Sequence, residues 1–311
     1  MKKSPYIIML IALLCLATLS ELAPLLGSST GYFHSSMWFQ IYESPLFGSA
    51  CLGSAFAYWF LLPFKKREFI VSLIIGLIID SVLIKLRLSI INPVAQLLHI
   101  GPGLLGGALL AILWRTWLGI KTNDKAALQK NLEILGLSLS MPIMLSLGTT
   151  MRYSGLLVYD PHCYALDSLW GFQTSFIISK ILRNNSILNL IMYAIYFHLS
   201  LYMMLAQVIV YKHNEEVKDG NKHLIPAILF ILIAICGSAL YKFFPVVGIE
   251  AYCGLNSFPN GPWPQANLNP LPIEAPPFLA RNGMPSLHLS WILAVYYSLY
   301  RTKSTYRHLA R

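Results

Sequence analysis

Residues 69–86 read FIVSLIIGLIIDSVLIKL, and residues 102–120 read PGLLGGALLAILWRTWLGI. Each run is almost wholly apolar and is as long as the roughly 17–25 residues that a helix needs to cross a bilayer. The whole 311-residue chain has this character, because 56% of its residues are hydrophobic and only 12% are charged. A water-exposed surface needs a higher density of charge. The sequence therefore predicts an integral membrane protein and argues against a soluble enzyme or transcription factor.

Eight segments have, or nearly have, the length and composition of a membrane-spanning helix. They are residues 6–26, 47–64, 69–86, 102–120, 131–150, 186–211, 224–241 and 285–300, of which the last is the shortest. Lys2 and Lys3 precede the first run as in a signal peptide, but the run is long and no clear cleavage site follows. We interpret it as an uncleaved helix, so that the predicted fold is an all-α, polytopic transmembrane bundle of about eight spans.

Lys and Arg cluster between the apolar runs, which is typical of membrane orientation and not of a nucleic-acid-binding face. With the N-terminus in the cytoplasm, alternation of the spans places fifteen of the 23 basic residues inside. They are Lys2, Lys3, Lys65, Lys66, Arg67, Lys121, Lys125, Lys130, Lys212, Lys218, Lys222, Arg301, Lys303, Arg307 and Arg311. This is the positive-inside pattern, and it predicts that both termini are cytoplasmic.

Two outer loops, 151–185 and 242–284, are longer than a simple connection needs. The first mixes acidic and aromatic residues, which favours helices lying at the membrane surface. The second is rich in Pro and Gly and cannot form one long helix. Functional sites commonly lie in such loops. Cys163 and Cys253 fall in these two loops and are predicted to face the outer compartment, with a disulfide between them left open.

The stretch 281–291, RNGMPSLHLSW, opens the last apolar run at its outer end. Pro285 suits the first turn of a helix, whose free amides and dipole attract an anion. Ser286 adds a hydroxyl donor, Arg281 a planar cation suited to phosphate, and His288 a group that titrates near neutrality. The stretch predicts a phosphate pocket with an acid or base attached. The alternative is an ordinary helix start with a packed histidine.

This stretch resembles the second signature of the type-2 phosphatidic acid phosphatase superfamily, in the Pro-Ser-Leu-His form of its inositolphosphotransferase-like branch, which is related to inositol phosphorylceramide synthases. Residues 167–176 (DSLWGFQTSF) and 241–248 (YKFFPVVG) are similar to two further segments of that branch. The resemblance covers about residues 155–300. It implies a lipid-phosphate phosphatase or inositolphosphotransferase-like protein that acts on phosphorylated lipids at the outer membrane face, without a cofactor or metal.

The resemblance also implies roles for individual residues. Ser286 would bind phosphate and His288 would protonate the leaving group. The first signature of the superfamily is not present in its usual form, and Arg281 and Lys242 are predicted to supply its positive charge. Asp167 and Gln173 would line the site or cap an interfacial helix, and the structural role is the more favoured.

The third signature of the superfamily carries the nucleophilic histidine and its aspartate partner, and no segment of the sequence matches it. We therefore expect residues 151–311 to be a C-terminally incomplete phosphatidic acid phosphatase-like domain and residues 1–150 to be membrane helices of unassigned role. Two alternatives stay open. One is a non-catalytic protein that binds lipid phosphate head groups, and the other is a transporter that uses the charges of Asp80 and Arg115 within the spans.

Overall fold

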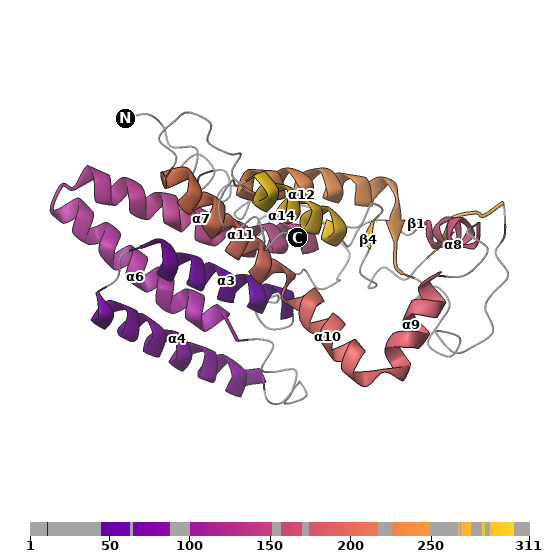
Figure 1. Cartoon of the computed structure of the whole chain (residues 1–311), viewed down its shortest axis with the longest axis horizontal. Helices are drawn as coiled ribbons and strands as arrows, with labels where there is room; N and C mark the ends of the chain where they lie inside the picture. The colour runs from indigo at the N-terminus through magenta and orange to yellow at the C-terminus, as the bar shows by residue number, and fades with distance from the viewer. Residues whose placement is uncertain are drawn as a thin grey trace, which may run out of the picture. The chain divides into compact units, whose positions relative to one another are not determined.

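The computed structural model describes residues 45–62, 65–87, 100–150, 157–169, 174–216, 226–248, 269–274, 282–283 and 287–301, together with residues 11 and 267. The described part contains ten helices and four strands of two residues each (Figure 1). The described part is mostly helical, as predicted, but it also contains these short strands, which the prediction of an all-α fold did not include. The chain divides into two compact units, of which the first comprises residues 1–150, 197–233 and 290–311, and the second residues 151–196 and 234–289. The segment 151–311 is thus shared between both units.

The first unit is a bundle in which one helix lies at the centre. Its elements are α3 (Pro45–Leu61), α4 (Lys66–Arg87), α6 (Pro102–Lys121), α7 (Lys125–Thr150), α11 (Leu199–Glu216), the first part of α12 (Pro226–Phe243) and most of α14 (Leu287–Arg301). Helix α3 packs against α6, α7 and α11, and α4 packs against α6 (Figure 1). The central position of α3 explains why Phe47, Cys51 and Tyr58 are fully buried.

Small residues bring α4 and α6 into close contact. A Cβ atom built on Gly103 would lie 2.5 Å from the carbonyl oxygen of Gly76, and one on Gly107 would lie 2.2 Å from that of Ser72. Neither position has room for a side chain. Gly103 and Gly107 are four residues apart, the spacing through which membrane helices commonly approach each other.

The turn between α6 and α7 is short because its residues suit a sharp reversal. Asn123 adopts a positive φ of 53°, a conformation that Asn tolerates better than most residues. The carboxylate of Asp124 then accepts a hydrogen bond from the amide of Ala127 at 3.0 Å and caps the start of α7. The sequence therefore reverses direction here within three residues.

The outer face of the α4–α6 pair is apolar and exposed. On α4 the exposed side chains include Val71, Ile74, Ile78 and Val82, and on α6 they include Leu110, Leu113, Trp114, Trp117 and Ile120. Exposed apolar surface that continues along two helices is a mark of contact with lipid or with another protein.

Seven of the eight predicted apolar runs fall on described helices, and the run 6–26 lies outside the described residues apart from Ile11. The run 186–211 is two helices, α10 (Ser186–Phe197) and α11, because the helix is interrupted at His198. By length and apolar composition, the described part of the chain contains one helix that could cross a membrane, α6, or two if α10 and α11 are counted as one broken span. The number of spans stays a prediction.

The second unit contains short helices and the four strands. Its elements are β1 (Leu157–Val158), α8 (Asp160–Ser168), α9 (Thr174–Asn184), α10, the last part of α12, β2 (Pro245–Val246), β3 (Ile273–Glu274) and β4 (Asn282–Gly283). The buried rings of Tyr164 on α8 and Phe176 on α9 meet edge to face, with 6.2 Å between their centroids. Helix α10 has no buried residue, and its large apolar side chains, such as Ile187 and Leu190, are exposed.

Candidate functional site

The second unit brings distant parts of the sequence together through its strands. Strand β2 pairs antiparallel with β4, so that Pro245 lies opposite Gly283 and Val246 opposite Asn282. Strand β1 pairs in the same way with β3. The amide of Tyr159, which follows β1, donates to the carbonyl oxygen of Pro245 at 2.8 Å. The four strands are therefore linked backbone to backbone, although they come from separate parts of the chain.

Asp160 fixes the loop that follows β2. Its carboxylate, only 4% exposed, accepts hydrogen bonds from the amides of Val247 at 2.9 Å and Gly248 at 2.7 Å. Gly248 has a φ of 99°, which a residue with a side chain rarely adopts. Two charge-assisted bonds compensate for the burial of the carboxylate. The loop at 245–248, part of a segment that the resemblance singles out, is held by a residue at the start of α8.

The aromatic ring of Tyr159 connects this loop to α8. Its centroid lies 5.6 Å from that of Phe244 and 5.2 Å from that of His162. The Nδ1 atom of His162 is buried and has no hydrogen-bond partner within the described part of the chain.

The thiol of Cys163 lies one turn from Asp160 and is half-buried. Burial, and then the negative charge of Asp160, raise the pKa of this thiol above its usual value. Cys163 carries a free thiol, and Cys253, with which the sequence left a disulfide open, lies outside the described residues.

Three of the residues predicted to form or line the phosphate pocket lie at the ends of described helices. Lys242 belongs to the last turn of α12, and His288 is the second residue of α14. Asp167 is half-buried in the last turn of α8. Arg281, Ser286 and Gln173 lie outside the described residues, although Arg281 directly precedes β4 in the sequence and Ser286 directly precedes α14.

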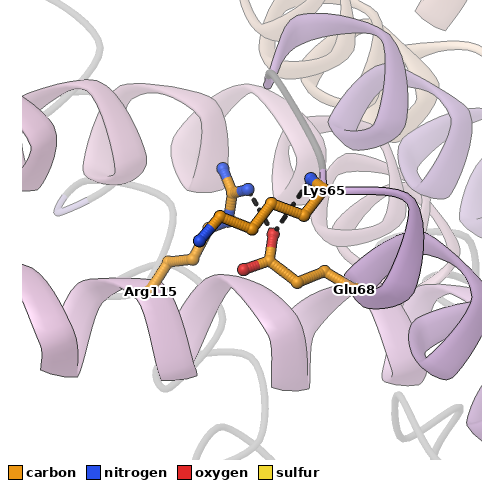
Figure 2. A network of polar contacts seen from close by, with 3 residues as sticks. All are labelled: Lys65, Glu68 and Arg115. Atoms are coloured by element: carbon orange, nitrogen blue, oxygen red, sulfur yellow. Dashed lines mark hydrogen bonds and ion pairs between the residues drawn. The ribbon is translucent and has the colours of Figure 1, made fainter.

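In the first unit, Asp80 and Arg115, the charged residues deep in the apolar runs, are each bound to a neighbouring helix. The carboxylate of Asp80 accepts hydrogen bonds from the amides of Gly103 at 2.8 Å and Leu104 at 3.2 Å, at the start of α6. Arg115 forms an ion pair with Glu68, whose carboxylate also accepts a bond from the amide of Lys65 at 3.4 Å (Figure 2). Asp80 and Arg115 each join α4 to α6 and thus have a structural role.

No structural role was predicted for Asp160 from the sequence, and Glu68 was not identified as the partner of Arg115. A signal for Asp160 existed, because an Asp followed by Pro161 is typical of a helix start. That its carboxylate would reach the amides of Val247 and Gly248, 87 and 88 residues further along, could not be read from the sequence. Searches against family models, curated proteins and solved structures gave no match for this chain.

Proposed function

We propose that the chain is a multi-pass membrane protein whose second unit binds the phosphate of a phosphorylated lipid and carries out phosphoester hydrolysis or head-group transfer. The observation that supports the proposal is the pairing of β2 with β4. It joins the loop after Lys242 to the segment that begins with Arg281 and continues into Ser286 and His288. Two segments that resemble the same enzyme superfamily are thus neighbours, although about 35 residues separate them in the sequence.

The chemistry follows from the residue types. The first amides of α14 have no partner within the helix and, with the dipole, favour an anion. Arg281 and Lys242 would neutralise the phosphate oxygens, and Ser286 would donate a hydrogen bond to one of them. His288 would give a proton to the departing oxygen, a contribution of typically 10²–10⁴-fold in rate. Asp167 and Gln173 would line the edge of the site.

Binding without turnover is the second candidate function. It needs only the anion-binding groups of the pocket, without the His-x₃-Asp pair that the superfamily uses to form a phosphohistidine. A general acid alone falls far short of the acceleration that phosphoester cleavage requires.

The proposed membrane arrangement has about eight spans, both termini in the cytoplasm and the site on the extracytoplasmic side. Its support is the exposed apolar surface of α4, α6 and α10, the close glycine contacts between α4 and α6, and the distribution of Lys and Arg. Labelling of Cys163 by a membrane-impermeant maleimide in intact cells tests the orientation. Labelling from the cytoplasmic side alone would contradict it.

The decisive experiment measures binding and turnover separately on the purified full chain. Binding of vesicles that contain phosphatidic acid is compared with binding of phosphatidylcholine vesicles, and release of inorganic phosphate is followed in the same samples. Arg281→Ala should weaken binding of phosphatidic acid by about tenfold or more, because a charged hydrogen bond contributes roughly 1.5–3 kcal/mol. Arg183→Ala, an exposed position on α9, is the matched control and should have no effect.

The turnover result decides between the two candidates. Phosphate release that His288→Ala abolishes and His308→Ala leaves intact would support the enzyme. Binding that Arg281→Ala weakens, without any phosphate release, would support the binding protein. Equal affinity for the two kinds of vesicle would contradict both.

A further inference from the structure

A groove runs between α4 and α6 in the first unit. Its volume is about 360 Å³, within the range of roughly 300–1,000 Å³ typical of ligand clefts. Its floor consists of the small residues Ser72, Gly107 and Ala111. The groove exists because these small residues lie between longer ones, so that the two helices touch along their small residues and leave a hollow above them.

The walls of the groove are apolar and belong to the exposed face of the helix pair. Val71 on α4 is 54% exposed, and Leu110 and Trp114 on α6 are 51% and 56% exposed. Ile75 completes the lining on the α4 side. A groove of this kind accepts a flexible hydrocarbon chain, because the apolar side chains of its walls offer dispersion contacts.

One end of the groove is charged. Arg67, Glu68 and Arg115 line it, and the ion pair of Glu68 with Arg115 cancels one positive charge (Figure 2). The charge of Arg67 is then in excess, and the side chains of Lys65 and Lys66, which immediately precede it, are exposed. This end therefore carries net positive charge and is complementary to an anion.

Aromatic residues mark the same end of α6. The rings of Trp114 and Trp117 stack with 4.9 Å between their centroids, and the ammonium of Lys121 lies 5.4 Å from the ring of Trp117. Trp next to Lys or Arg is typical of the level of the lipid head groups. The apolar groove thus begins where head groups end, and its charged end lies where phosphates would be.

We propose that this groove binds one anionic phospholipid, with an acyl chain between Val71, Ile75 and Leu110 and its phosphate at Arg67. Glu68 positions Arg115 beside that phosphate and keeps the helix pair closed at this end. The inference shares with the proposed function only the membrane setting, because the groove lies in the first unit and uses none of the residues of the second. It predicts an inner-leaflet lipid, since Lys65, Lys66 and Arg67 fall in a predicted cytoplasmic segment.

The test uses the full chain in detergent with added short-chain lipids, and native mass spectrometry counts bound lipid. Phosphatidylglycerol should bind at least about tenfold more tightly than phosphatidylcholine, and Arg67→Gln should remove most of that preference, as expected for a charged hydrogen bond to phosphate. Ala111→Trp should abolish binding of both lipids by filling the groove. Leu113→Trp adds the same side chain to an exposed position of α6 outside the groove, and it should leave binding unchanged.

The proposal would be overturned by equal affinities for the two lipids, by equal effects of Ala111→Trp and Leu113→Trp, or by a groove occupied by a second copy. Occupation by a second copy would appear as a dimer that Ala111→Trp dissociates.

Arg67 is exposed, so Arg67→Gln tests the site even if Ala111→Trp fails to fold. Glycerol phosphate without acyl chains should not bind, and competition by it as strong as that of the lipid would argue against the groove. Arg281→Ala should leave this binding intact, which separates failure here from failure of the proposed function.

Discussion

The carboxylate of Asp160 lies 2.7 Å from the backbone nitrogen of Gly248 and accepts its hydrogen bond, although 87 residues lie between them in the chain. A second oxygen of the same carboxylate accepts the amide of Val247. This double contact joins the start of α8 to the loop after β2. Strand β2 in turn pairs with β4, in the segment that leads toward Ser286 and His288.

Replacement of Asp160 by Ala should therefore lower the stability of the second unit by about 2–3 kcal/mol, because two buried amides lose a charged acceptor. Asp160→Asn should cost less, since one amide oxygen remains. Hydrogen exchange at the amides of Val247 and Gly248 and thermal unfolding in detergent measure the effect. Asp167→Asn is the control, and exchange at these two amides that is as fast in this control as in Asp160→Ala would contradict a specific role for Asp160.

The ion pair of Glu68 and Arg115 should couple α4 to α6. Glu68→Gln and Arg115→Gln should each destabilise the protein, because each leaves a partly buried charge without its partner. The double variant should be less destabilised than the sum of the single variants, by about 1 kcal/mol or more. Thermal unfolding of the four proteins gives this coupling energy. Strict additivity would show that the pair contributes nothing to the contact.

Gly107 should tolerate almost no substitution. A Cβ atom there would lie 2.2 Å from the carbonyl oxygen of Ser72, so Gly107→Ala forces α4 away from α6 and should cost about 1–3 kcal/mol. At Gly106, one residue earlier, an added Cβ would meet its nearest atom at 3.5 Å, an ordinary contact. Gly106→Ala is therefore the matched control and should be neutral or stabilising, as expected for Ala in a helix. A similar loss in both variants would point to the helix itself and not to the α4–α6 contact.

The helices could be predicted from the sequence because, in the described part of the chain, each long apolar run corresponds to one helix or to two consecutive helices. The runs 69–86 and 102–120 coincide closely with α4 and α6. The break at His198 could not be predicted, because no Pro or Gly marks it and the apolar run continues through it.

Only part of the candidate site could be predicted from the sequence. The residue types in 281–291 predicted a phosphate pocket, since Arg, Ser and His carry that chemistry in their own side chains. The contact of Asp160 with Gly248 depends on how loops far apart in the chain fold together, and apolar periodicity contains no information about it. The same reason hid the pairing of Arg115 with Glu68, since the charges of α4 could be assigned to the membrane surface without naming a partner.

The pH dependence of Cys163 follows from its surroundings. Burial and the neighbouring Asp160 raise the pKa of its thiol, so at neutral pH it holds less thiolate than an ordinary cysteine. Alkylation by a small maleimide should therefore be slower than that of the same cysteine in the unfolded chain, and its rate should keep rising at a pH where an exposed thiol has levelled off. Cys163→Ser identifies its share of the label.

The raised pKa of Cys163 also makes the stability of the protein depend on pH. Because the pKa of this thiol is higher in the folded chain than in the unfolded chain, the stabilising contribution of the neutral thiol is complete below the pKa of the unfolded chain. It is lost as pH rises through the folded value. Stability of the wild-type protein should thus fall more between pH 8 and 10 than that of Cys163→Ser. Asp160→Asn should shift the alkylation profile toward lower pH, and an unchanged profile in that variant would show that the carboxylate does not act on the thiol.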